Sequence, residues 1–140
     1  MVADVKLLML YTHDYWLQPH KKNLDDAADT PEPIAMQEGV VALIHVEPQD
    51  LAARRKKVTK AIKQLKWLAR KFETLNIALH SFAHLATQSA PPEEAQSILK
   101  EIQERLTNSG FHVCSSPFGY FNEFKLHVAG PSLAKVFVDI

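Results

Sequence analysis

The hydrophobic and polar positions of the chain fall into short apolar runs separated by polar connections. Continuous apolar runs rich in β-branched and aromatic residues are typical of buried strands. We predict strands over Val5–Tyr11, Val40–Glu47, Asn76–Phe82, Phe111–Ser116, Phe121–Val128 and Lys135–Ile140. The first strand is expected to end near Thr12. Gln18–Glu38 contains three prolines and many polar side chains, and is expected to form a long surface loop.

Two longer segments carry apolar residues at three- and four-residue steps, which is one face of an amphipathic helix. The first is Gln49–Leu75 and the second is Ala90–Gly110. In the second, Pro91 and Pro92 suit a first helical turn, and Gly110 suits a C-terminal stop. Both apolar faces are expected to lie in the core.

The order of these elements predicts an α/β fold. We expect a single domain over residues 1–140, with a mixed β-sheet and two main helices packed on one face. Right-handed crossovers between strands of one sheet place successive helices on the same side. A chain of 140 residues with 46% hydrophobic content is sufficient for one core.

The compartment is indicated by three further features of the sequence. No run approaches the roughly 20 apolar residues that a membrane-spanning helix needs. Asp4 stands where a secretory signal would carry positive charge. Cys114 is the only cysteine, which excludes an internal disulfide and fits a reducing compartment. We therefore expect a cytoplasmic protein with no membrane partner.

Charge is distributed unevenly, although the formal net charge is zero. Residues 1–53 hold nine acids and three bases, whereas Arg54–Lys71 holds nine bases and no acid. On the predicted helix most of these bases lie opposite the apolar face, with Trp67 among them. A solvated face with a partly covered indole is the favoured interpretation. A surface for nucleic acid or a partner protein is the alternative.

Candidate chemistry is concentrated after the third strand and after the turn that follows the fourth. His84 follows the third strand among small residues, where an imidazole can serve as a general base, orient a water or bind a ligand. A histidine that caps a turn is the structural alternative. Tyr120 follows the turn at Pro117–Gly119, and both places are strand ends, where α/β sheets bind ligands.

Metal and cofactor sites are not indicated. His80 and His84 are four residues apart, but they fall on a predicted strand and the loop after it, so they do not share a helix face. The chain has no phosphate loop and no dinucleotide fingerprint. Four histidines lie within predicted strands, and any of them can line a pocket: His45, His80, His112 and His127. Asp14 and Glu47 are the carboxylates nearest the strand ends. We expect no metal and no cofactor.

Two long motifs resemble a known family. "FAHLATQSAPPEEAQSIL" and "GFHVCSSPFGYFNEFKLHVAGPSLA" are similar to the N-terminal editing domain of archaeal-type threonyl-tRNA synthetases, and "LLMLYTHDYW" and "VVALIHVE" stand where that family has its first two strands. The resemblance covers nearly the whole chain. It implies a fold like that of D-aminoacyl-tRNA deacylases and hydrolysis of serine wrongly attached to threonine tRNA. The implied partners are the tRNA acceptor end with its amino acid and a synthetase catalytic subunit. A homodimer is expected on separate grounds, because exposed strands at a sheet edge can pair with a second copy.

The resemblance also implies roles for individual residues. His84 matches the family's site histidine, Ala83 matches the neighbour whose backbone approaches the ligand, and Asp14 with Tyr15 matches the acidic and aromatic pair after the first strand. The resulting site has catalytic and substrate-binding members. Catalytic roles are expected for His84, Asn122 and Phe121, and substrate-binding roles for Ala83, Tyr120, Asp14, Tyr15, His45, Glu47 and Lys135.

Three positions depart from the family pattern. The family has tyrosine and lysine where this chain has Phe121 and Asn122, and glutamate where it has Lys135. Asn122 can form hydrogen bonds but carries no charge. Lys135 replaces the missing cation if its side chain reaches the pocket. Lys125 is a poor replacement, because strand alternation places it on the opposite face from Asn122.

Two other functions fit the same residues. One is a D-aminoacyl-tRNA deacylase, which follows from the implied fold. The other is a non-catalytic module that keeps the pocket and binds an amino acid, a nucleotide or a tRNA end. The absent lysine favours the binding module, and the retained "FAHL" and "PFGY" favour an enzyme.

Overall fold

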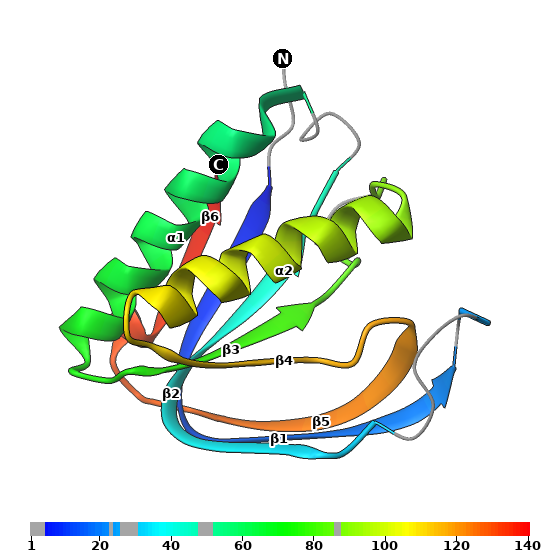
Figure 1. The fold of residues 1–140 in the computed structure, drawn as a ribbon. Helices are drawn as coiled ribbons and strands as arrows, with labels where there is room; N and C mark the ends of the chain where they lie inside the picture. The colour runs from blue at the N-terminus through cyan, green and yellow to red at the C-terminus, as the bar shows by residue number, and fades with distance from the viewer. Residues whose placement is uncertain (1–4, 23, 26–30, 48–51, 86–87) are drawn as a thin grey trace.

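The computed structural model describes residues 5–22, 24–25, 31–47, 52–85 and 88–140. It forms one mixed sheet with two helices, as predicted (Figure 1). The elements in chain order are β1 Lys6–Lys22, β2 Ile34–His45, α1 Arg54–Lys71, β3 Asn76–Ser81, α2 Pro92–Asn108, β4 His112–Ser115, β5 Tyr120–Val128, the 3-10 turn η2 Ser132–Ala134 and β6 Lys135–Asp139. The first helix is shorter than predicted, and residues 49–51 of its expected start lie outside the described residues.

The sheet has the strand order β4-β3-β2-β1-β5, and β6 also pairs with β1. The pairs β2 with β3 and β3 with β4 are parallel, whereas β1 is antiparallel to β2, β5 and β6. Residues Lys6–Leu10 of β1 pair with β6, and Thr12–Lys22 pair with β5. Strand β1 therefore pairs first with β6 and then with β5 along the same edge.

Both helices cover the same face of the sheet (Figure 1). Their apolar residues recur at helical spacing and lie in the main core with the inward side chains of the strands. The helical members of this core are Val58, Ala61, Ile62, Leu65, Leu68 and Ala69 from α1, and Ile98, Leu99, Ile102 and Leu106 from α2. The predicted apolar faces are thus the faces that the structure buries.

The long loop predicted over Gln18–Glu38 is wrong at both ends. Strand β1 continues to Lys22 and β2 begins at Ile34. Just before this predicted loop, Tyr15 and Leu17 are buried and alternate with more exposed neighbours, as in a half-buried strand. The same strand continues into the predicted loop. Pro19 is accommodated because the register with β5 shifts next to it, and a proline is tolerated at such an irregularity.

The extended halves of β1, β2 and β5 curve beneath β3 and β4 (Figure 1). They enclose a second apolar cluster on the sheet face that the helices leave open. Its buried members are Leu10, Tyr15, Leu17, Met36, Val41, Leu43 and Ala78. At the bend Glu38 has a φ of 49°, and its carboxylate accepts a hydrogen bond from Tyr11 and contacts the His13 ring at 3.0 Å. The sheet is therefore folded over onto itself.

Gly39, next to this bend, has no room for a side chain. A Cβ there would lie 2.7 Å from the Met36 side chain and 2.9 Å from Asn76 Cβ. We expect Gly39→Ala to lower the free energy of unfolding by about 1–3 kcal/mol, as overpacking does in other cores. Urea denaturation would measure this change. Gly130→Ala is the matched control, because a Cβ there meets nothing within 4 Å; equal stability of the two variants would refute the steric explanation.

Candidate functional site

A pocket of about 420 Å³ opens at the carboxyl ends of β2 and β3. Its walls come from the end of β2, the segment between β3 and α2, the first turn of α2 and the connection from β4 into β5. The predicted site residues that line this pocket are His45, Ala83, His84, Tyr120, Phe121 and Asn122. The two motifs of the sequence, far apart along the chain, therefore meet at one cavity.

His84 lies exposed in the turn that follows β3, beside the exposed Ala83. The backbone is held against the sheet just before this turn, because the N–H of Phe82 donates to the carbonyl of Ile44 at 2.9 Å. The rings of Phe82 and His84 are 5.0 Å apart and nearly perpendicular. An imidazole that is held in place and open to solvent can exchange protons with a bound water.

His45 holds the loop that carries His84. Its ring is buried, and the N–H of Leu85 donates to Nδ1 at 3.3 Å while Nε2 lies 2.6 Å from the carbonyl oxygen of Gln88. The neutral tautomer with hydrogen on Nε2 satisfies both contacts, since one nitrogen accepts and the other donates. Both ring nitrogens are thus engaged by backbone groups, and His45 orients the loop from inside the pocket wall.

The opposite wall is formed by the turn that leads into β5. Gly119 has a φ of 84°, a conformation that glycine adopts without strain, and the chain then continues through Tyr120, Phe121 and Asn122. Phe121 is 57% exposed, so its ring forms part of the rim. The hydroxyl of Ser116 accepts from the N–H of Ser81 at 3.1 Å and ties this turn to β3.

Asn122 has an unsatisfied polar atom in this wall. Its Nδ2 donates to the Tyr120 carbonyl oxygen at 3.4 Å, whereas its buried Oδ1 has no hydrogen-bond partner in the described part of the chain. A buried acceptor without a partner costs about 1–3 kcal/mol. A donor on a ligand would remove that cost, so the amide is suited to recognise an N–H or O–H group.

His80 is a pocket residue to which the sequence analysis assigned no catalytic or binding role. It is buried at the pocket floor, with Nδ1 2.9 Å from the Tyr15 hydroxyl and its ring 4.6 Å from that of Phe124. Burial lowers the pKa of His80 to about 4 and raises the pKa of Tyr15. The imidazole is therefore neutral at pH 7. Its place on a predicted strand was one signal. Strand alternation was another, because His80 and Phe82 are two residues apart and both line the pocket.

Tyr15 does not line the pocket, although it was expected to bind substrate. It is 1% exposed and lies behind His80, which its hydroxyl contacts. The reason is the extended β1, which carries Tyr15 into the second apolar cluster. Its place in the structure is that of a support for the pocket floor.

Three other expected binding residues lie away from the pocket. Asp14 pairs along β1 with Gln37 and His127. Glu47 is buried and forms an ion pair with Lys6 at 3.3 Å. The Nζ of Lys135 donates to three backbone carbonyls of the turn before β6, those of Ala129 at 2.7 Å and of Gly130 and Pro131 at 3.2 Å. Lys135 therefore does not supply the cation that the pocket lacks.

Two features are absent from the described residues: a metal-binding cluster and a membrane-spanning helix. No group of three or more His, Cys, Asp or Glu side chains in that part of the chain is arranged to hold a metal ion. No helix within the same residues is long and apolar enough to cross a membrane.

Solved structures identify the class of fold. The c-Myc DNA unwinding element binding protein superposes with a TM-score of 0.71 at 12% identity, over 96% of this chain and 98% of that one. A probable eukaryotic D-amino acid tRNA deacylase superposes with a TM-score of 0.64 at 10% identity, over 97% and 99%. The fold is that of the D-aminoacyl-tRNA deacylases, as expected.

Sequence comparison then identifies the family. Residues 5–140 match the archaea-specific editing domain of threonyl-tRNA synthetase, and the chain belongs to this family. It is 34% identical over 135 residues to the threonine-tRNA ligase of Thermococcus onnurineus, covering 91% of this chain and 21% of that protein. The ligase of Methanocaldococcus jannaschii is 27% identical over 130 residues, covering 91% and 21%. The chain thus spans about a fifth of the length of these relatives.

Proposed function

We propose that this chain hydrolyses the ester bond of mischarged tRNA, with serine on threonine tRNA as the expected substrate. The observation that carries the proposal is that one pocket is lined both by His84 and by Tyr120, Phe121 and Asn122. Its volume of about 420 Å³ falls within the range of sites that bind small molecules. The aminoacylated end of the tRNA is the part that would enter it.

Ester hydrolysis requires a positioned water and stabilisation of the oxyanion, and the terminal ribose hydroxyl of the RNA can assist. His84 orients the water or accepts its proton at the open side of the pocket. Ala83 has only a methyl group, so the ligand can approach the backbone beside His84. The neutral His80 offers a polar group at the floor, and Asn122 Oδ1 accepts a hydrogen bond from the bound amino acid.

A non-catalytic binding module is the second candidate, and one specific observation favours it. Neither lysine nor arginine lines the described part of the pocket, and Lys135 is engaged elsewhere. A site without a cation stabilises an oxyanion less strongly than one with a lysine. The retained pocket would then bind an amino acid, a nucleotide or the tRNA end without turnover.

A panel of charged tRNAs tests these functions. Threonine tRNA carrying serine, threonine or a D-amino acid is incubated with the chain, and the free amino acid is measured over time. We expect serine to be released faster than threonine. Release of the D-amino acid alone would identify a D-aminoacyl-tRNA deacylase. No release from any of them, with release gained by Asn122→Lys, would mean that the pocket serves binding.

The buried oxygen of Asn122 leads to a separate prediction. We expect Asn122→Leu to lower the hydrolysis rate about 5- to 150-fold, because an acceptor worth about 1–3 kcal/mol to the ligand is lost. The free energy of unfolding should stay equal or rise, since the unpaired oxygen of the free protein is also removed.

Asn76→Leu is the matched control for this variant. The amide of Asn76 donates to the carbonyls of Gln37 and Glu38, outside the pocket, so its loss should lower stability and leave hydrolysis unchanged. Single-turnover rates and urea denaturation of both variants measure the two effects. A fall in stability with unchanged hydrolysis in Asn122→Leu would contradict the ligand-binding role.

The same proposal includes partners and location. The chain would act on tRNA in the cytoplasm and would associate with a synthetase catalytic subunit. A homodimer is the further expectation, because exposed strands at a sheet edge can pair with a second copy. Sedimentation of the chain alone and with that subunit would measure both associations.

A further inference from the structure

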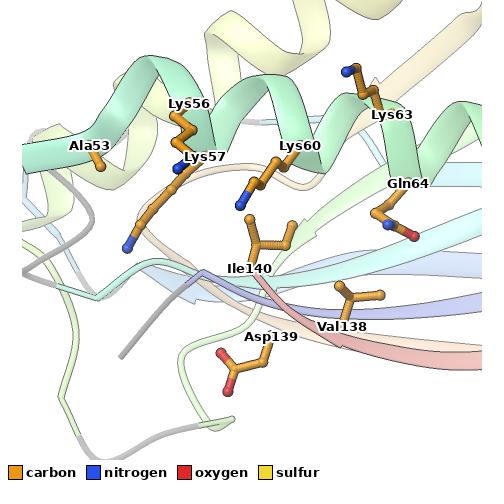
Figure 2. Close-up of a pocket in the computed structure, with 9 residues that line it drawn as sticks. All are labelled: Ala53, Lys56, Lys57, Lys60, Lys63, Gln64, Val138, Asp139 and Ile140. Atoms are coloured by element: carbon orange, nitrogen blue, oxygen red, sulfur yellow. The ribbon is translucent and has the colours of Figure 1, made fainter. Parts of the chain in front are cut away.

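A second hollow lies between α1 and the end of β6. Its volume is about 520 Å³, and it is distinct from the pocket beside β3, since the two share no lining residue. Lys56, Lys57, Lys60 and Lys63 line it from the helix, and Asp139 lines it from β6 (Figure 2). We call this hollow the α1 groove. Figure 1 shows that α2 lies between α1 and the connection from β4 to β5.

The described residues supply little negative charge to the α1 groove. Its one acidic lining side chain, Asp139, lies 3.0 Å from the Nζ of Lys6 and is paired there. In the described part of the chain no carboxylate pairs with Lys56, Lys60 or Lys63. The α1 groove therefore keeps an excess of cations that a ligand can neutralise.

Lys56, Lys60 and Lys63 form a line along the helix with Trp67. Lys56, Lys60, Lys63 and Trp67 follow one another at steps of four, three and four residues, which places them on one stripe of α1. The stripe is about 16 Å long, because each residue of a helix rises about 1.5 Å. Trp67 is 41% exposed and ends the stripe with an aromatic ring.

The positive surface extends across α1 toward α2. Arg54, Arg55 and Arg105 surround a third hollow of about 470 Å³, with Glu101 as its acidic lining residue. The carboxylate of Glu101 lies 2.9 Å from Arg54 and 3.8 Å from Arg105, so it is shared between two guanidinium groups. The first turn of α2, which lines the pocket, carries the exposed Glu93 and Glu94, so the positive surface ends before the pocket.

We propose that the α1 groove and its stripe bind the sugar–phosphate backbone of the tRNA, away from the end that enters the pocket. A row of lysines that no described carboxylate neutralises suits a polymer with a charge at every unit, and an exposed indole in the same row can stack on a base. A free amino acid or nucleotide is too small to reach both sides of α2, whereas tRNA is long enough. The inference rests on the proposed function only in naming tRNA as the RNA concerned.

Binding of uncharged threonine tRNA at several salt concentrations tests the inference. We expect Lys60→Gln with Lys63→Gln to weaken binding about tenfold and to reduce the slope of log affinity against log salt by roughly 1.5, because each lost phosphate contact changes it by about 0.7–0.9. The control is Lys100→Gln with Lys125→Gln, which removes equal charge from exposed lysines outside the groove. The control should keep the slope of the natural chain.

A second readout separates this inference from the proposed function. Hydrolysis of a seryl ester on adenosine, which lacks the tRNA body, should be unchanged by the groove variant, whereas the KM for full-length seryl-tRNA should rise. If neither substrate is hydrolysed, the proposed function fails. The salt dependence of tRNA binding then tests by itself whether the α1 groove binds tRNA. Equal slopes in the groove variant and the control would overturn the inference. The inference would also be overturned if the groove variant bound tRNA like the natural chain but no longer bound polyglutamate, because the groove would then bind an acidic protein.

Discussion

Replacement of His84 by alanine is expected to slow release of the amino acid about 10²- to 10⁴-fold, which is the usual contribution of a positioned acid–base group. The imidazole is exposed at the pocket mouth, and the loop that carries it is held by His45 through backbone groups. Loss of the side chain removes the group that orients the water or takes its proton. Single-turnover hydrolysis of the best substrate of the tRNA panel measures the effect.

His112→Ala is the control for this variant, because His112 is exposed on β4 and does not line the pocket. Its hydrolysis rate should equal that of the natural chain. His84→Ala should keep its stability and its affinity for uncharged tRNA, since the side chain is on the surface. A His84→Ala chain that hydrolyses at the natural rate would exclude the histidine from catalysis and return it to the role of a turn residue.

Acid is expected to destabilise the protein through His80 by roughly 3 kcal/mol between pH 7 and pH 4. Burial lowers the pKa of His80 to about 4 from its ordinary value of 6.5. Between these values the unfolded chain binds a proton that the folded chain does not, so the free energy of unfolding decreases as the pH falls. The contribution of His80 is fully present above pH 6.5 and is lost on the way to pH 4.

Urea denaturation at several pH values measures this loss. We expect His80→Gln to be less stable than the natural chain at pH 7, because the contact with Tyr15 changes, and to lose less stability on acidification. His112→Gln, at an exposed position, should keep the natural pH dependence. Identical pH dependence in His80→Gln and the natural chain would show that His80 does not control acid stability.

The hydrophobic pattern was sufficient for most of the elements. The apolar faces of α1 and α2 were predicted because helical spacing is a local property, and β3, β5 and β6 followed from short apolar runs. The extension of β1 to Lys22 could not be predicted in the same way. A strand that contains Pro19 resembles a loop until its pairing with β5 and the bulge beside the proline are known.

The candidate site was likewise only partly predictable from the sequence. The motifs around His84 and Asn122 were recognised because a run of residue types is written in the sequence, and the structure places both at one pocket. The positions of Lys135 and Glu47 were not predictable. Whether a long side chain reaches a pocket or bonds to a nearby turn or ion partner depends on distances across the fold.

By itself the sequence determined the α/β class, the family, the basic character of α1 and the residue types of the two motifs, because each depends on neighbours along the chain. Only the tertiary structure decided that the sheet folds over on itself, that His80 becomes a neutral group at the pocket floor and that Asn122 Oδ1 stays unpaired. Burial, hydrogen bonding and pKa are properties of surroundings, and here those surroundings come from strands distant in sequence.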